Sequence, residues 1–226
     1  MSEHDYVAYL EGKLADARDA RKTTRTELQI EIAVASLLKE KTFHAISVDM
    51  ITERARVAHG TFYRYFPGKH ELVAKTMSDY FEFVRATRPR FARETGDFDA
   101  ISVSNRHYVR CFRANVGLMR CHFHLKDEDD KIAAVGRLAD RGLSDRIIRR
   151  IERRGPVPES ARRELRLMTH GLIGMVDELL LKVYGRANPP LAEFAEDPDL
   201  VADTLTRLWH ASLDAYLRDH VREPVE

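Results

Sequence analysis

Apolar residues recur every three or four positions along almost the whole chain, which is the spacing of one face of an α-helix. Two segments of the C-terminal half, Ala161–Val183 and Leu205–Leu217, keep this spacing over several turns. No alternation of apolar and polar residues runs longer than four positions, so β-strands are not indicated. We therefore predict an all-α protein.

Composition narrows the class of protein further. The chain has 226 residues, of which 44% are hydrophobic and 32% charged, as expected for a folded globular protein. No apolar run approaches the roughly 18–20 residues that cross a bilayer, and the acidic start of the chain lacks the apolar core of a secretory signal. The two cysteines, Cys111 and Cys121, are too few for the disulfide framework of a secreted protein. We expect a cytoplasmic protein that does not associate with membranes.

Charge is spread unevenly along the chain, although the formal net charge is only +1. Between Arg18 and Lys75, eleven Lys and Arg residues stand against seven Asp and Glu residues, a surplus of four positive charges. The remainder of the chain is therefore acidic overall. A basic N-terminal third is compatible with binding to nucleic acid, although most charged runs are solvated helix faces.

The most informative segment is residues 47–72, SVDMITERARVAHGTFYRYFPGKHEL. Ser47 can cap a first short helix, and a tight turn near residues 55–58 separates it from a second one, which is the spacing of a helix-turn-helix. Phe62 and Phe66 lie one turn apart on the second helix, and we expect them to pack inward. The exposed side then carries small, hydroxyl, imidazole and cationic groups that fit a DNA major groove: His59, Gly60, Thr61, Tyr63 and Arg64.

These groups suit different parts of a DNA duplex. The hydroxyls of Thr61 and Tyr63 suit phosphate oxygens, whereas Arg64 and His59 can reach base edges. Lys69 follows in the first turn of the next helix, where free backbone N–H groups already favour a phosphate.

The same segment resembles the DNA-binding domain of the TetR family of transcriptional regulators. The residues that match the family pattern in order and spacing are Ser47, Ile51, Ala55, Val57, Gly60, Thr61, Tyr63, Tyr65, Phe66, Lys69 and Leu72. A looser match lies upstream at Ile30, Ala33, Leu37, Leu38, Glu40 and Phe43. The resemblance implies a three-helix DNA-binding domain over residues 24–72, between a helical N-terminal extension over 1–23 and a larger helical ligand-binding and dimerisation domain over 73–226.

The resemblance also implies which residues contact DNA. It assigns His59, Gly60, Thr61, Tyr63 and Tyr65 of the second helix, together with Ser47 and Lys69. Tyr65 is equally well explained by packing, and Lys22 and Arg25 either contact DNA or form a solvated basic face. With Arg64 added from its exposed position, the predicted DNA-binding residues are Arg25, Ser47, His59, Gly60, Thr61, Tyr63, Arg64, Tyr65 and Lys69.

Two residues at the turn depart from the family pattern. Arg56 stands where the family has glycine, and a left-handed backbone at this position would cost on the order of 1 kcal/mol. Ala58 stands where Ser or Thr usually precedes the second helix, so a cap worth about 1 kcal/mol is missing. After the second helix, Pro67 occupies the expected first position of a long helix that reaches Val84.

The two apolar C-terminal helices carry wider stripes than a small monomer can bury, and they resemble the pair that forms a four-helix dimer interface in the family. The predicted interface residues are Leu165, Leu172, Val176, Leu205, Leu208, Trp209, Ser212, Leu213 and Tyr216. Burial within one chain is the alternative. A symmetric homodimer would present two recognition helices to the half-sites of a pseudo-palindromic operator in double-stranded DNA.

The middle helices are expected to enclose a pocket for a small, largely apolar ligand. Residues suited to such a site are His107, Tyr108, Cys111, Phe112, His122, Met168, His170, Met175 and Glu178. Helical spacing predicts one continuous apolar face through Tyr108, Phe112, Val116, Met119 and Phe123. On such a straight helix Cys111 and Cys121 would lie about 15 Å apart, too far for a disulfide.

The segment Cys121–His124, with His107 and Cys111 nearby, contains imidazole and thiolate groups that suit zinc or copper. Neighbouring and alternating residues of one helix point in different directions, so we predict no metal and no other cofactor. Redox sensing through the two thiols is the other reading of this segment.

The function predicted from the sequence is a sequence-specific DNA-binding transcriptional regulator, a repressor that a small-molecule inducer releases from its operator. Because no Ser–His–Asp, paired-carboxylate or phosphate-loop arrangement is recognisable, we do not expect an enzyme. The alternative is an all-α enzyme or small-molecule-binding protein in which the helix-turn-helix is incidental.

Overall fold

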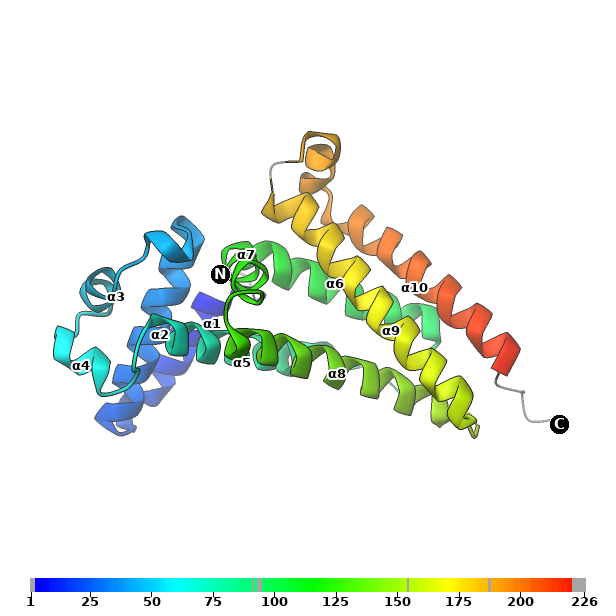
Figure 1. The fold of residues 1–226 in the computed structure, drawn as a ribbon, viewed down its shortest axis with the longest axis horizontal. Helices are drawn as coiled ribbons and strands as arrows, with labels where there is room; N and C mark the ends of the chain where they lie inside the picture. The colour runs from blue at the N-terminus through cyan, green and yellow to red at the C-terminus, as the bar shows by residue number, and fades with distance from the viewer. Residues whose placement is uncertain (1–2, 91, 93–94, 154, 187, 221–226) are drawn as a thin grey trace. The chain divides into compact units, whose positions relative to one another are not determined.

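The computed structural model describes residues 3–90, 92, 95–153, 155–186 and 188–220 (Figure 1). Its helices are α1 (Tyr6–Asp16), α2 (Lys22–Glu40), α3 (Val48–Ala55), α4 (His59–Tyr63), α5 (Lys69–Thr87), α6 (Asp97–Ala114), α7 (Val116–Leu125), α8 (Asp130–Glu152), α9 (Glu159–Leu180) and α10 (Pro198–His220). Shorter helical turns are η1 (Ala17–Asp19), η2 (Phe43–Ala45), η3 (Leu181–Gly185) and η4 (Pro189–Glu196). No strand occurs among the described residues, so the predicted all-α fold is confirmed. None of the helices in this part of the chain combines the length and the apolar content that crossing a membrane requires.

The chain divides into two compact units, each assembled from two separate stretches of sequence. Unit 1 contains Met1–Arg88 and Arg110–Gly136, and unit 2 contains Pro89–Val109 and Arg137–Glu226. Helices α6 and α8 therefore contribute one part to each unit. This grouping differs from the sequence-based division at residues 23 and 72, because α1 and α7 both belong to the unit that holds the helix-turn-helix.

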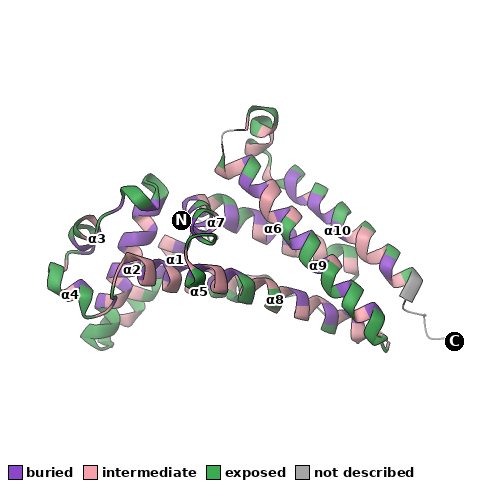
Figure 2. Cartoon of the chain, in the orientation of Figure 1, coloured by how far each residue is buried: buried purple, intermediate pink, exposed green. Residues whose placement is uncertain are grey.

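Helix α2 is the centre of unit 1 and packs against α1, α3, α5 and α7. Buried side chains recur along it at helical spacing, and Figure 2 shows the buried positions as bands between exposed ones. The core also takes large side chains from α4 and α5: Phe62, Leu72, Met77, Tyr80 and Phe83. The helix-turn-helix thus packs on a core whose centre is the buried face of α2.

Gly117 marks the place where α7 meets α2. A Cβ atom at this position would lie 2.0 Å from the carbonyl oxygen of Leu38, well inside any van der Waals contact. Only glycine allows the two helix backbones to approach this closely. The contact explains why α7 groups with the helix-turn-helix rather than with the helices that follow it.

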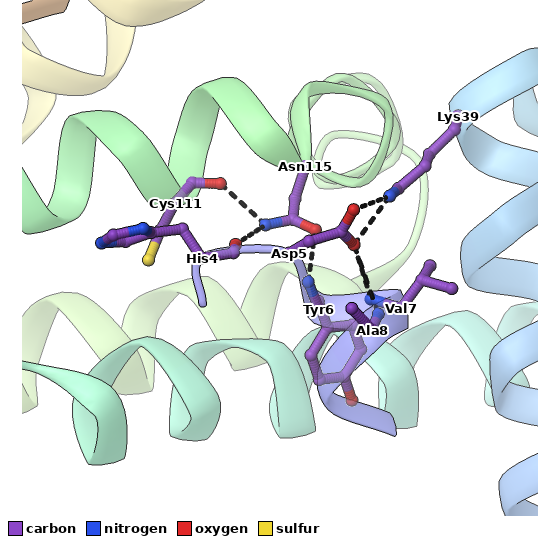
Figure 3. A network of polar contacts seen from close by, with 8 residues as sticks. All are labelled: His4, Asp5, Tyr6, Val7, Ala8, Lys39, Cys111 and Asn115. Atoms are coloured by element: carbon purple, nitrogen blue, oxygen red, sulfur yellow. Dashed lines mark hydrogen bonds and ion pairs between the residues drawn. The ribbon is translucent and has the colours of Figure 1, made fainter. Parts of the chain in front are cut away.

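The N-terminal extension is docked on unit 1 by a polar network (Figure 3). The carboxylate of Asp5 caps α1 by accepting from the Val7 N–H (3.0 Å), and it also pairs with the Lys39 amine of α2 (2.6 Å). The side-chain amide of Asn115 donates to the carbonyl oxygen of His4 (2.7 Å) and accepts from the backbone N–H of Tyr6 (2.9 Å). The N-terminal extension therefore packs on the rest of unit 1.

Tyr6 completes this docking in the interior. Its ring is fully buried against Tyr80 and Phe83 of α5, and its hydroxyl donates to the buried carboxylate of Glu31 on α2. Burial raises the pKa of Glu31 above its ordinary value, although the hydrogen bond from Tyr6 and the charge of Lys75 oppose this shift. Tyr6 and Lys75, whose amine lies 3.2 Å from the other carboxylate oxygen, thus both supply partners to the buried Glu31 carboxyl group.

Two expectations about helix boundaries were wrong. The apolar face from Tyr108 to Phe123 is broken at Asn115, whose backbone (φ −124°, ψ 31°) ends α6 and precedes α7. The break arises because Asn115 bonds to residues of the N-terminal extension, which no local pattern encodes. In the same way α5 begins at Lys69 with Gly68 as its N-cap, so Pro67 lies outside the helix.

The break places the two cysteines on different helices, Cys111 on α6 and Cys121 on α7. The separation expected for a straight helix therefore does not apply. Both side chains are buried, and burial raises the pKa of each thiol to about 12. Neither is a reactive thiolate near neutral pH.

Unit 2 is a helical bundle whose core contains Ile148, Ile151, Ala161, Leu165 and Tyr216. Two buried hydrogen bonds lie in it: the Tyr216 hydroxyl donates to the Ala161 carbonyl oxygen (2.9 Å), and the hydroxyls of Ser144 and Thr169 share a hydrogen bond (2.7 Å). The two apolar segments predicted as C-terminal helices are α9, extended by the turn η3, and α10.

Candidate DNA-binding interface

The first helix of the helix-turn-helix, α3, is positioned by its start and by its buried face. The Ser47 hydroxyl oxygen accepts from the Met50 N–H (3.2 Å), as the predicted N-cap requires. Ile51 and Ala55 are buried toward α2, and Arg54 forms a two-pronged ion pair with the Glu40 carboxylate at 3.0 Å. Helix α3 is therefore held firmly against α2.

The turn between α3 and α4 contains a left-handed residue, the case whose cost was estimated from the sequence. Arg56 has φ 56° and ψ 42°, and among the described residues it is the only non-glycine residue with positive φ. The conformation closes α3, because the Arg56 N–H reaches the Glu53 carbonyl oxygen (3.1 Å) and the Val57 N–H reaches that of Thr52 (3.0 Å). Ala58 then precedes α4 without a side-chain cap.

Helix α4 has one buried face and one exposed face. Phe62 of α4 and Phe66, which follows the helix, pack inward with their rings 5.9 Å apart. His59, Gly60 and Tyr63 are exposed. A Cβ atom built on Gly60 would meet nothing within 4 Å.

The polar groups on this exposed face make only solvent-accessible contacts. His59 Nδ1 lies 2.7 Å from a carboxylate oxygen of Asp49, and the His59 ring lies 5.3 Å from that of Tyr63. Arg64 donates to the Thr61 hydroxyl oxygen at 3.3 Å. Exposed pairs of this kind contribute little to stability, so their members can exchange these partners for another surface.

Lys69 is placed differently from the other candidate residues. Its amine donates to the carbonyl oxygens of Phe43 (3.2 Å) and Ile46 (3.0 Å) and lies 4.3 Å from the centre of the Phe43 ring. The amine therefore ties the start of α5 to the segment that leads into α3. Of the remaining candidates, Tyr65 is half-buried and Arg25 is exposed in α2.

Sequence reasoning missed Asp49 as a neighbour of the recognition residues. Its carboxylate reaches His59 only because the turn folds α4 back beside the start of α3. Asp49 lies in the first turn of α3, and its separation of ten residues from His59 carries no periodic signal that would join the two.

The candidate ligand residues are divided between the units. Cys111, Phe112 and His122 are buried in unit 1, whereas His107, Tyr108, Met168, His170, Met175 and Glu178 belong to unit 2. Tyr108 donates to Asp177 (2.6 Å), Glu178 accepts from Arg186 (3.0 Å), and His170 is exposed. In unit 1, Nδ1 of His122 is buried and has no hydrogen-bond partner among the described residues.

Most candidate dimer residues are buried within the chain itself. These are Leu165, Leu172, Val176, Leu205, Trp209 and Tyr216. Leu208 is exposed, and Ser212 and Leu213 are half-buried. The exposed faces of α9 and α10 instead carry Leu167, Gly171, Gly174, Ala211 and Ala215.

Comparisons with known proteins agree with this architecture. A model of the family described as bacterial regulatory proteins of the tetR family matches residues 33–76, which include the whole helix-turn-helix. No curated protein matches the sequence. A tetR-family transcriptional regulator from Streptomyces coelicolor is similar with a TM-score of 0.70 and 15% identity, over 87% of this chain and 83% of that one. A transcriptional regulator from Rhodococcus sp. Rha1 gives 0.65 and 16%, over 88% and 99%.

An all-α chain that presents an exposed short helix from a helix-turn-helix defines a class, the DNA-binding transcriptional regulators. At this level of identity the solved structures show the fold alone. The match over residues 33–76 shows that this part of the chain resembles the DNA-binding domain of the tetR family.

Proposed function

We propose that the protein is a homodimeric repressor that binds a pseudo-palindromic operator through α4 and leaves it when a small, largely apolar ligand binds. The observation that carries the DNA-binding part is the bare face of α4. Tyr63 is 51% exposed, and Gly60 has open space where a side chain would be. The Tyr63 ring meets those of His59 and Phe62 on its own helix yet leaves half of its surface exposed, and a phosphate backbone that approaches closely would use both Tyr63 and Gly60.

The candidate residues divide into contact and positioning roles. Thr61 and Tyr63 offer hydroxyls to phosphate oxygens, and Arg64 and His59 offer donors to base edges. Gly60 leaves the backbone accessible between them.

Three further candidates flank this face. Ser47 and Lys69 act mainly by holding α3 and the segment that leads into it in place, because both side chains make internal hydrogen bonds. Arg25 extends the basic surface along α2, and Tyr65 supports α4 from its half-buried position.

Selection from a random-sequence duplex pool at fixed salt tests the proposal. The parent should enrich a pseudo-palindrome, and Tyr63→Ala/Arg64→Ala should lose that enrichment and show a smaller salt slope. Phe98→Ala/Arg120→Ala is a matched control, because it also removes one exposed aromatic and one exposed cationic side chain, but neither belongs to the helix-turn-helix. Equal binding by both variants would contradict the assignment of α4. Absence of enrichment by the parent would favour the alternative of a small-molecule-binding protein or enzyme.

Dimerisation is proposed through the exposed faces of α9 and α10. Leu167 is 76% exposed, and a Cβ atom on Gly171 or Gly174 would meet nothing within 4 Å. Glycines that internal packing does not require permit close approach of a partner helix, and Leu208 lies on the corresponding exposed face of α10. Two copies joined in this way could address half-sites about one helical turn, or ~34–36 Å, apart or somewhat more.

Sedimentation of two leucine variants tests this interface. Leu167→Glu should shift the protein from dimer to monomer, because two carboxylates would meet in an apolar contact. Leu138→Glu, at a 66% exposed position of α8, is the matched control and should remain dimeric. A dimeric Leu167→Glu variant would exclude this face as the interface.

Ligand release rests on the family resemblance and on His122. This side chain is buried among Phe81 and Phe123, and a polar atom without a partner in such a place is costly unless something satisfies it. A ligand that binds more tightly to the conformer unsuited to the operator would shift the population toward that conformer. The affinity for the operator would then fall by as much as the ligand's affinities for the two conformers differ. Displacement of the parent from the selected operator by apolar compounds tests this step, and a compound that releases it should act more weakly on His122→Leu. Because the proposed operator is chromosomal DNA, we infer that the protein acts in the cytoplasm.

A further inference from the structure

Three potential metal ligands meet on the surface of unit 1, away from α4. His44 belongs to the turn η2, His124 to the last turn of α7, and Glu128 to the turn that follows α7. The Nε2 atoms of the two histidines are 3.2 Å apart, and the Glu128 carboxylate lies 3.9 Å from His44 Nε2 and 3.8 Å from His124 Nε2. Among the described residues this is the group of three whose ligand atoms all lie within 4.8 Å of one another.

The distances fit a small divalent ion. Two imidazole nitrogens at about 2.0–2.1 Å from a tetrahedral zinc ion are roughly 3.3 Å apart, close to the separation found here. The carboxylate needs to move by only about 0.5 Å, and the Glu128 side chain is exposed and free to rotate. Two imidazoles and one carboxylate leave a further position for water, the pattern of an open zinc site.

The protein backbone brings these side chains together without an ion. His124 and Glu128 are four residues apart at the end of α7, and this spacing puts them on one side of the chain. His44 follows the buried Phe43 and precedes the buried Ile46, whose carbonyl oxygens are both held by Lys69. The site is therefore largely formed before any ion arrives.

We propose that His44, His124 and Glu128 bind one divalent transition-metal ion, zinc in the first place. Imidazole suits zinc, copper and nickel, whereas calcium and magnesium prefer sets of oxygen ligands. The ion would join the segment that leads into α3 to the end of α7. This is not the set considered from the sequence: Cys111, Cys121 and His122 are buried, and only His124 of that segment takes part.

Calorimetric titration of the full-length, tag-free, chelator-treated protein with ZnCl₂ tests the site. The parent should bind one ion per chain, and His44→Ala and His124→Ala should each weaken binding by at least the roughly 10–100-fold that loss of an outer-shell partner costs. Glu128→Gln should weaken it less, and the double histidine variant should bind no ion. His170→Ala, which removes an exposed histidine of α9, should bind like the parent.

A second pair of measurements separates this site from other histidines and from misfolding. Zinc should raise the Tm of the parent but not that of the double variant, while the two Tm values without zinc agree because both histidines are exposed. Co²⁺ should give visible absorption bands with the parent only. The proposal is overturned if the parent takes up no zinc, if the double variant binds like the parent, or if His59→Ala, beside Asp49, abolishes the binding instead.

Discussion

Replacing Arg56 by glycine should stabilise the protein. The left-handed backbone at this residue (φ 56°, ψ 42°) costs an L-amino acid about 1–2 kcal/mol, and glycine avoids most of that cost. Glycine in turn loses about 0.5–1 kcal/mol more conformational freedom on folding. The Arg56 side chain is exposed, so its removal sacrifices little packing. The difference between the central values predicts a gain of about 0.75 kcal/mol for Arg56→Gly, or a rise in Tm of roughly 1.5–3 °C for a chain of this length.

The same substitution two residues earlier provides the control. Arg54→Gly introduces glycine into the interior of α3, which costs about 1 kcal/mol of helix propensity, and it also removes the ion pair with Glu40. Thermal unfolding followed by far-UV circular dichroism should therefore place Arg56→Gly above the parent and Arg54→Gly below it. If Arg56→Gly unfolded at or below the midpoint of the parent, the assignment of backbone strain to this turn would be refuted.

Three further substitutions test unit 1. Gly117→Ala should destabilise by about 1–3 kcal/mol in urea unfolding, because its Cβ would meet the backbone of α2, whereas Gly12→Ala, with open space at its Cβ, should be neutral or stabilising. Burial lowers the pKa of His122 to about 4. Below about pH 6.5 this histidine therefore binds a proton in the unfolded chain, whereas in the folded chain it stays neutral down to about pH 4. His122 therefore makes stability fall by on the order of 3 kcal/mol between about pH 6.5 and pH 4, and His122→Leu should flatten that part of a stability–pH profile. Lys69→Met should lower the free energy of unfolding by about 1–3 kcal/mol, because the carbonyl oxygens of Phe43 and Ile46 lose their charged donor. Amide hydrogen exchange over residues 43–50 should become faster. If exchange were unchanged, Lys69 would not hold this segment, and contact with DNA would be its remaining role.

Local sequence signals predicted the helix-turn-helix well. The cap at Ser47, the tight turn near Arg56 and the inward packing of Phe62 and Phe66 each depend on residues within one or two turns of one another. Helical spacing likewise indicated α9 and α10. These features are short-range, so a pattern along the chain contains them.

Features that depend on distant residues escaped sequence reasoning. Asn115 ends α6 because its side chain bonds to His4 and Tyr6, more than a hundred residues away. His44 and His124 are separated by 80 residues, and the packing of α7 on α2 brings them together. No periodicity within a single segment records either contact, so only the folded structure shows them.

The discontinuous composition of unit 1 has a consequence for its synthesis. Helices α1 to α5 leave the ribosome first, but α7, which covers one side of α2, follows only after residue 115. Until then the Leu38 region of α2 has no covering helix and Tyr6 lacks the Asn115 acceptor. A nascent chain that ends at residue 88 should therefore be protease-sensitive, whereas one that ends at residue 136 should resist, so the DNA-binding unit matures late although it is encoded early.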